Sequence, residues 1–504
     1  MKTTVKQGTL TGTPTEVLVI PGYEGETGFG KAIQPLDRNL GGQLTELRKS
    51  GEFQGKPNQT VLVHTRGAVP AKRILLVGLG KHEDLTLDRV RQAMGTAAKR
   101  VRQTEARSFA AAIPGVNRSG MWPDDLAQAM VDGVILGDYR FTAYRTDSSK
   151  KNSKALNSMT ILIDKTSLLS TVKRGIQRGE ATGEATCFAR DLCNHPANVM
   201  TPPRVVEEAK KIAKEKNVRL TVLNPSKMKQ LGMGGVLGVG QASQHPSQFI
   251  ILEYRGGKKN DKPIVFVGKT VTFDTGGISL KPSENMEHMK ADMTGGAEVL
   301  ATVRAAARLR LPLNIFGLLP VAENMPGGRA TKPGDILTML SGKTVEVQNT
   351  DAEGRLILAD GLAYAERLKP ACVIDIATLT GACIVALGQF AIGMLGNDEK
   401  LKGQLKQAGE RSGERVWEMP LWDEYFEQLK SDVADMRNIG GRGGGMITAA
   451  MFLKQFVGKF PWAHLDIAST DWSASDRPCI SKGPTAHGTR LLIQYLLNTV
   501  NKPH

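Results

Sequence analysis

Short hydrophobic runs in the first third of the chain predict a compact α/β unit. Each run has the length of a strand and is rich in Val, Ile, Leu or Ala. The runs are TEVLVIPGY (15–23), QTVLVHTR (59–66), KRILLVGLG (72–80), FAAAIPGV (109–116) and MTILIDK (159–165). Between them, the segment 84–103 carries apolar residues at helical spacing. Strands therefore alternate with at least one amphipathic helix in this part.

The remainder of the chain continues the alternation with longer apolar runs. They are RLTVLN (219–224), FIILEY (249–254), PIVFVG (263–268), LNIFGLLPV (313–321), ACVIDIA (371–377) and WAHLDIA (462–468). Helical segments such as AEVLATVRAAARLRL (297–311) separate them. Continuous apolar strands alternating with helices indicate a largely parallel sheet covered on both faces. Ligand sites in such sheets gather at the carboxyl ends of the strands.

The length of 504 residues is too great for one hydrophobic core. We expect an α/β protein with a smaller N-terminal α/β domain (1–165), a linker helix (166–194) and a larger C-terminal α/β/α domain (195–504). The larger domain should have a mixed, mostly parallel central sheet.

Composition and charge narrow the class of protein. Hydrophobic residues make up 40% of the chain, and no stretch approaches the roughly 20 apolar residues that cross a bilayer. We therefore expect a cytoplasmic protein that does not contact a membrane. The five cysteines are scattered and form no C-x-x-C pattern, which favours buried thiols. The net charge of +16 favours a solvated basic surface, with contact to a polyanion such as DNA as the alternative.

The segment NTDAEGRLILADGL (349–362) is the first candidate site. Asp351, Glu353 and Arg355 alternate, so on an extended backbone their side chains point to one face. The apolar residues that follow have helical spacing. Either the arginine forms a salt bridge with both carboxylates, or the triplet belongs to a larger site.

A second cluster follows the predicted strand at 263–268. Lys269, Asp274, Lys281 and Asp292 lie among glycines and apolar residues, where an unpaired charge is costly to bury. Together with Asp351 and Glu353, the two aspartates supply four negative charges. Two divalent cations would balance them, and Mn²⁺, Mg²⁺ and Zn²⁺ accept oxygen ligands. An ion-pair network is the alternative.

Three segments carry a resemblance to a known family. VGKTVTFDTGGISLKP (267–282), MKADMTGGAEVL (289–300) and NTDAEGRLILADGL resemble, in order and spacing, hallmark segments of the leucine aminopeptidase (cytosol aminopeptidase) family. The resemblance implies hydrolysis of the N-terminal peptide bond of peptides, with leucine-like residues preferred, in intracellular peptide turnover. It also implies a homohexamer, and some members have a second role in binding DNA.

The same resemblance assigns roles to residues of this chain. One metal ion would be bound by Asp274, Asp351 and Glu353, and the other by Lys269, Asp274, Asp292 and Glu353. Manganese is the favoured ion, with zinc or magnesium as alternatives. Lys269 can bind a metal only as the neutral amine, so we expect a lowered pKa. The remaining roles are catalysis by Lys281, a bicarbonate ion held by Arg355, and substrate binding by Met289 and Leu379.

Overall fold

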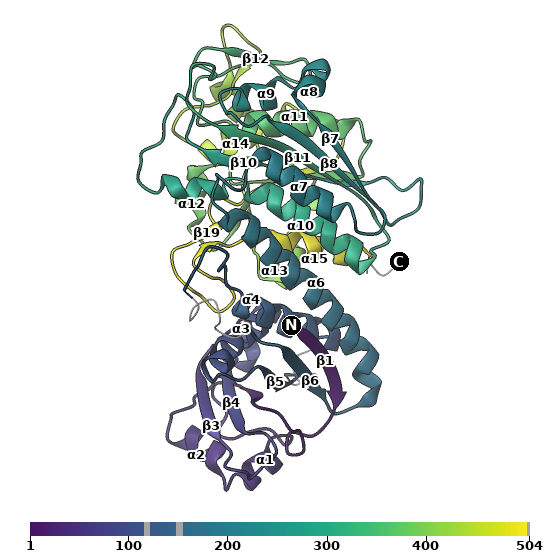
Figure 1. Ribbon diagram of the computed structural model, residues 1–504, viewed down its shortest axis with the longest axis vertical. Helices are drawn as coiled ribbons and strands as arrows, with labels where there is room; N and C mark the ends of the chain where they lie inside the picture. The colour runs from purple at the N-terminus through teal and green to yellow at the C-terminus, as the bar shows by residue number, and fades with distance from the viewer. Residues whose placement is uncertain (115–120, 148–154, 501–504) are drawn as a thin grey trace. The chain divides into compact units, whose positions relative to one another are not determined.

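The computed structural model describes residues 1–114, 121–147 and 155–500. The chain forms two compact units (Figure 1). The N-terminal unit comprises Met1–Cys187 and Ser475–Lys482, and the C-terminal unit comprises Phe188–Ala474 and Gly483–His504. No helix among the described residues combines the length and the apolar character that a membrane span needs.

The N-terminal unit is built on a six-stranded sheet. In spatial order its strands are β1 (Lys2–Gln7), β6 (Ser158–Ile163), β5 (Ser108–Ala112), β2 (Leu18–Gly22), β4 (Arg73–Gly78) and β3 (Thr60–His64). All neighbours are parallel except β3 and β4. Five of these strands coincide with the predicted runs. The edge strand β1 was missed because KTTVKQ has a single apolar residue and offers no hydrophobic pattern.

Helices cover both faces of this sheet. The face that carries Val17 and Val19 packs against α3 (Leu87–Gln103), α4 (Pro123–Asp138) and the start of α6 (Leu169–Asn194). The opposite face, with Leu18 and Ile20, packs against α1 (Gln34–Asn39) and α2 (Gln43–Lys49). The alternation arises because successive side chains of a strand point to opposite faces.

The C-terminal unit contains a nine-stranded mixed sheet. Its path is β16 (Val416–Glu418), β15 (Ile392–Gly396), β18 (Trp462–Asp466), β14 (Cys372–Ala377), β9 (Ile264–Gly268), β11 (Asn314–Asn324), β8 (Gln248–Arg255) and β7 (Val218–Leu223), with β10 (Thr270–Asp274) paired to β11. The central strands β18, β14, β9 and β11 are parallel, whereas β15, β8 and β7 introduce antiparallel pairs. The expected mixed, mostly parallel α/β fold is confirmed.

Two helices pack on the central strands and frame the candidate site. Figure 1 shows α10 (Thr294–Leu309) and α11 (Gly354–Glu366) on opposite faces of the sheet, and every residue of β9 is buried between them. The other helices of this unit are α7 (Pro202–Ile212), α8 (Pro225–Leu231), α9 (Gly234–Gly240), α12 (Gly381–Leu387), α13 (Glu399–Ser412), α14 (Gly445–Lys454) and α15 (Thr489–Val500). Small sheets are formed by β12 (Ile336–Thr338), β13 (Thr344–Glu346) and β17 (Met436–Arg437), and by β19 (Trp472–Ser473) and β20 (Gly483–Pro484).

The burial of the five cysteines can be compared with the expectation of buried thiols. Cys193, Cys372, Cys383 and Cys479 are buried as expected, whereas Cys187 is half-buried.

Candidate active site

The candidate site lies at the carboxyl edge of the large sheet. Strand β9 runs directly into Lys269, and β10 ends at Asp274. Strand β14, parallel to β9, is followed by Thr378 and Leu379. The polar residues of the second sequence cluster therefore lie at the carboxyl ends of the strands, where ligand sites of parallel sheets are usually found.

The triplet Asp351, Glu353 and Arg355 does not adopt the extended conformation that its spacing suggested. Asp351 lies in a turn, Glu353 precedes α11 with αR backbone angles, and Arg355 lies in the first helical turn. The turn nevertheless brings two of the carboxylates to the end of β10. Asp274, Asp351 and Glu353 each present an oxygen atom within 4.8 Å of the others.

Two lysines join the two sequence clusters through ion pairs. Lys269 Nζ lies 2.8 Å from Asp292 Oδ1 and 2.9 Å from Glu353 Oε1. Lys281 Nζ lies 2.8 Å from Asp274 Oδ2 and also pairs with Asp351. The structure thus brings together Lys269, Asp274, Lys281, Asp292, Asp351 and Glu353. Arg355 does not hold Asp351 and Glu353 together, because these two carboxylates pair with Lys281 and Lys269 instead.

Gly354 allows the close approach of Lys269 to α11. A Cβ atom at this position would lie 2.6 Å from Lys269 Cε and 2.8 Å from Nζ. The Lys269 ammonium group also donates a hydrogen bond of 2.9 Å to the Thr378 carbonyl oxygen. The amine is thus held between the segment that follows β14 and the start of α11.

The carboxylates exceed the positive charge that pairs with them. Four carboxylates face two lysines, a net charge of −2 when all six groups are ionised. Asp292 Oδ2 is buried without a hydrogen-bond partner among the described residues. A crowded, buried set of oxygen donors with an unpartnered atom and surplus negative charge fits divalent cations.

Burial and mutual repulsion shift the pKa values of these acids. Burial raises the pKa of Asp292 well above its usual range, with Lys269 opposing the shift. Burial, followed by the charge of Asp274, raises the pKa of Asp351 to about 6. Burial alone would lower the pKa of Lys269, but Asp292, Glu353 and Asp274 outweigh it, and the net direction is upward. The lowered pKa expected for Lys269 therefore does not arise from the protein's own groups, and it would require additional positive charge.

Arg355 is buried near the carboxylates but bonds elsewhere. Its Nη1 donates a hydrogen bond of 2.8 Å to the Asn438 carbonyl oxygen, and its Nε has no hydrogen-bond partner among the described residues. Burial lowers the pKa of Arg355 to about 10, with Glu353 and Asp466 opposing the shift. Arg355 therefore remains a cation near neutral pH.

The two predicted substrate residues are half-buried. Met289 lies in the 3₁₀ segment Met286–Ala291. The amide of Asp292 donates a hydrogen bond to the carbonyl oxygen of Met289. The Leu379 amide donates a hydrogen bond of 3.1 Å to Asp466 Oδ1. A substrate contact through the Leu379 backbone therefore has to use the carbonyl oxygen.

Three buried residues that support the site were missed from the sequence. Asn324 Nδ2 donates to Asp274 Oδ1 at 2.8 Å and to the Thr350 carbonyl oxygen at 3.0 Å. Asp466 accepts from the Leu379 amide and the Thr380 hydroxyl. Asn438 accepts a hydrogen bond from Arg355 and braces the turn at 349–352. Each lies far along the chain from its partner, so spacing within a motif could not reveal it.

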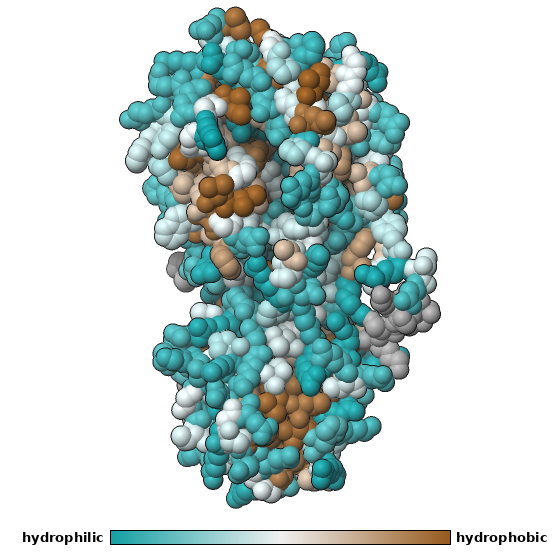
Figure 2. Space-filling model, turned by 90° about the vertical axis from the view of Figure 1, so that its left-hand side faces the viewer, coloured by the Kyte–Doolittle hydropathy of each residue, from teal (hydrophilic) through white to brown (hydrophobic). Residues whose placement is uncertain are grey.

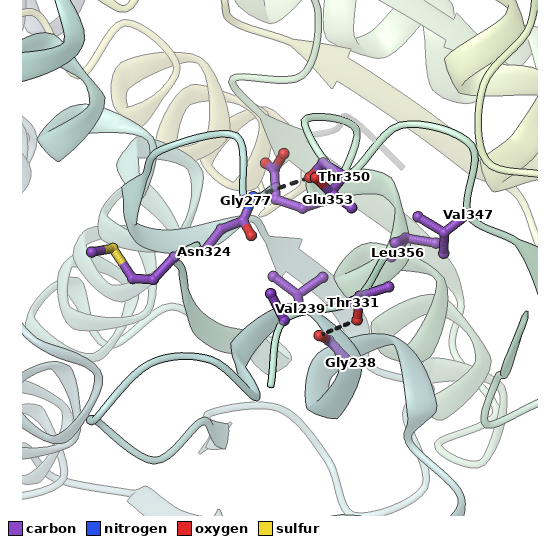
Figure 3. A pocket seen from close by; sticks show the side chains of 11 residues that line it. Gly238, Val239, Gly277, Asn324, Thr331, Val347, Thr350, Glu353 and Leu356 are labelled. Carbon is purple, nitrogen blue, oxygen red and sulfur yellow. Dashed lines mark hydrogen bonds between the residues drawn. The ribbon is translucent and has the colours of Figure 1, made fainter. Parts of the chain in front are cut away.

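A small cavity lies beside Glu353. Figure 3 shows Asn324 and Thr350 close to one another at this cavity, joined by a hydrogen bond, with Gly277 and Glu353 nearby. Its volume of about 10 Å³ is enough for one water-sized molecule.

Comparison with known proteins identifies the family. Residues 187–493 match the family model "Cytosol aminopeptidase family, catalytic domain", and residues 17–148 match the N-terminal domain of the same family. The chain belongs to the cytosol aminopeptidase family. The resemblance seen in the sequence is therefore confirmed, and the chain is a metallo-aminopeptidase, a hydrolase.

Relatives within the cytosol aminopeptidase family match almost the whole chain. A protein of Geobacter sp. (strain M21), named "Probable cytosol aminopeptidase", is 47% identical over 482 residues, 96% of each chain. A protein of the same name from Geotalea uraniireducens (strain Rf4) is 48% identical over 95% of this chain and 96% of the relative.

Two solved structures show the same fold. A point mutant of tomato leucine aminopeptidase has 34% identity and a TM-score of 0.89, covering 99% of this chain and 96% of that one. "Bottromycin maturation enzyme BotP in complex with Mn" has 34% identity and a TM-score of 0.85, covering 97% of this chain and 100% of that one. The likeness therefore extends over both units of the chain.

Proposed function

We propose that this aminopeptidase holds two divalent cations with Lys269, Asp274, Asp292, Asp351 and Glu353. The observation that carries the proposal is the surplus of buried carboxylate over positive charge, with Asp292 Oδ2 left unpartnered among the described residues. An ion-pair network built from the two lysines alone leaves that surplus in place. The cations would supply Lewis-acid chemistry and the activation of a water molecule. Manganese is the favoured ion, in line with the named manganese complex of a similar protein, and zinc and magnesium are alternatives.

Two cationic residues near the carboxylates would act on the substrate carbonyl and hold a proton-accepting anion. Lys281 Nζ pairs with Asp274 and Asp351 and its side chain is 22% exposed, so it can place positive charge near the carbonyl oxygen of the substrate. Arg355 offers unbonded guanidinium hydrogen atoms to an anion, and bicarbonate is the anion we propose. The protein groups thereby orient the substrate carbonyl and hold an anion that can accept and return a proton.

The substrate is the amino terminus of a peptide, with a leucine-like first residue preferred. Met289 and Leu379 are half-buried and would contact the substrate, Leu379 through its carbonyl oxygen. A carbonyl acceptor beside a set of carboxylates suits a positively charged or neutral α-amine and does not suit an internal amide. The role would be peptide turnover in the cytoplasm, in keeping with the names of the relatives.

A homohexamer is the assembly that we propose. The helix α12, which follows Leu379 and Thr380, exposes Ile384 and Val385, and Phe390 beyond it is 67% exposed. Figure 2 faces the side on which α12 lies in Figure 1 and shows a hydrophobic patch at the height of this helix. Contiguous exposed apolar residues commonly mark contacts between subunits. Sedimentation of the wild type and of Val385→Glu would test this, since a hexamer through α12 should dissociate in the variant.

Binding of DNA through the basic surface rests only on the net charge of +16. The family match and the named relatives give it no support. Evidence for DNA binding would be an electrophoretic mobility shift of DNA at low salt that disappears as the salt concentration rises.

The proposed function is tested by combining metal analysis with turnover. After chelation, the protein should lose release of leucine from leucine amide and regain it with Mn²⁺, with two ions bound per chain. Full turnover in the chelated protein would contradict the proposal.

A further inference from the structure

The N-terminal unit contains a cleft of about 960 Å³ whose lining includes none of the candidate active-site residues. Its wall is built from residues at the carboxyl ends of four parallel strands. They are Gln7 at the end of β1, Pro21 in β2, Ala112 in β5 and Ile163 in β6. This volume lies in the range of small-molecule sites, roughly 300–1,000 Å³.

The order of the strands places the cleft at a reversal of topology. The chain leaving β2 passes through α1 and α2 to β3 and β4, on one side of β2. The chain leaving β5 passes through α4 to β6, on the other side. Strands β2 and β5 are adjacent and parallel, and α1 and α2 pack on one face of the sheet whereas α4 packs on the other, so this edge is a topological switch point. Ligands of open parallel sheets bind in crevices at such points.

The floor of the cleft is apolar and its rim is polar. Phe29, Leu162 and Ile163 are buried, and Ile33 and Ile113 are half-buried. The polar side chains exposed at the rim are those of Gln7, Thr9, Lys31, Asp164 and Lys165, and Ala32 and Pro35 are exposed beside them. A ligand with an apolar or aromatic body and a charged head group matches this division.

Charged side chains of both signs surround the cleft, and a buried arginine adds a further positive charge behind its wall. The charged residues that line it are Lys31, Lys165, Asp164 and Glu26. Burial lowers the pKa of the nearby Arg48, and the charge of Glu26 opposes that shift. The Arg48 guanidinium carbon lies 4.3 Å from the centre of the Phe29 ring, which forms part of the wall. Arg48 also donates to the carbonyl oxygens of Tyr23 and Glu26.

Arg48 carries further unused donors. It is only 9% exposed, and its Nε and Nη2 have no hydrogen-bond partner among the described residues. The residues that line the cleft carry two cations and two carboxylates, and Arg48, which packs against the Phe29 ring without lining the cleft, makes the local balance positive by one charge. We propose that the cleft binds a small organic anion, consisting of an apolar or aromatic body with a phosphate or carboxylate group.

Calorimetric titration of the full-length, metal-loaded protein tests the proposal. Two probes, AMP and decanoate, carry both an apolar or aromatic body and an anionic group. Two fragments serve for comparison: adenosine lacks the anionic group, and inorganic phosphate lacks the body. AMP or decanoate should bind saturably, and the matching fragments should bind at least about tenfold more weakly, because neither fragment uses both the floor and the rim. Equal binding of phosphate alone would overturn the proposal, as would saturable binding by neither AMP nor decanoate.

A pair of charge reversals locates the site. Lys31→Glu combined with Lys165→Glu should weaken the bound probe on the order of tenfold, since both exposed side chains line the cleft. Lys2→Glu combined with Lys49→Glu changes the net charge equally on exposed residues of the same unit and should leave binding unchanged. Hydrogen exchange should slow in 7–11, 26–35 and 162–168 when the probe binds. Binding that is unaffected by the first pair, or weakened equally by both, would place the probe elsewhere and refute the assignment.

Discussion

Asn324 offers a sharp test of how the site is organised, because it touches one proposed metal ligand and nothing that would react. It is 4% exposed at the end of β11, and its Nδ2 bonds to Asp274 Oδ1 and to the Thr350 carbonyl oxygen. It therefore ties the end of β10 to the turn that carries Asp351. We infer that Asn324 is a positioning residue for Asp274.

The expected cost of removing this amide follows from the bonds that it makes. A hydrogen bond to a charged group contributes roughly 1.5–3 kcal/mol. Loss of a group that orients a metal ligand typically weakens metal binding by about 10–100-fold, or roughly 1.4–2.8 kcal/mol. These two ranges agree. Asn324→Ala should therefore weaken Mn²⁺ binding by about 10–100-fold, measured by competition with a chromophoric chelator.

A matched control lies on the same strand. Asn314, at the other end of β11, also donates two hydrogen bonds through Nδ2, to the carbonyl oxygens of Lys258 and Asp261. Asn314→Ala removes the same chemical group away from the carboxylates and should leave Mn²⁺ affinity within about threefold of wild type. Unchanged affinity in Asn324→Ala, or an equal loss in both variants, would refute the positioning role.

Three further variants test other parts of the account. Glu353→Ala should abolish turnover and lower the metal content measured by elemental analysis, since Glu353 would bridge both ions; wild-type metal content would contradict this role. Lys281→Ala should lower kcat by roughly 10²–10³-fold, because it removes the positive charge proposed to lie near the carbonyl oxygen of the substrate. Metal binding should be kept, since Lys281 competes with cations for Asp274 and Asp351. A loss of metal instead would show that Lys281 is misassigned. Asp360→Asn tests pH dependence: burial raises the pKa of Asp360 to about 7, although backbone N–H groups of Leu340, Val236 and Gly235 oppose the shift. The unfolded chain therefore ionises first, so the contribution of this carboxyl to stability is complete below about pH 4 and is lost as the pH rises to about 7. From about pH 5 to about pH 8 the wild type should lose about 2–3 kcal/mol more unfolding free energy than Asp360→Asn in urea titrations, and parallel losses would contradict the shifted pKa.

Much of the fold could be predicted because buried strands and amphipathic helices leave a pattern in the sequence. The strand β9 and the helix α11 were predicted from apolar runs alone, and both are almost entirely buried. The strand β1 could not be predicted, because it is an exposed edge held by backbone hydrogen bonds to β6. The alternation of Asp351, Glu353 and Arg355 suggested an extended segment, but a turn followed by a helix start brings the two carboxylates to the site instead.

The charged residues of the candidate site were picked out from the sequence, whereas the buried polar residues that hold them in place were not. Charge counting and the family resemblance both pointed to the carboxylates and lysines, which do lie together. Asn324 and Asp466 carry no local signature, because their partners lie 50 and 87 residues away. Only the pairing of β10 with β11 and of β14 with β18 brings them to the site.

The central claim is that the buried carboxylates hold two cations. Anomalous diffraction at the manganese edge, on crystals grown with Mn²⁺, tests it most directly. We predict two peaks per chain, both within bonding distance of Asp274 and Glu353, with Lys281 displaced from Asp274. An absence of peaks there, with Lys269 and Lys281 still paired to the four carboxylates, would contradict the claim.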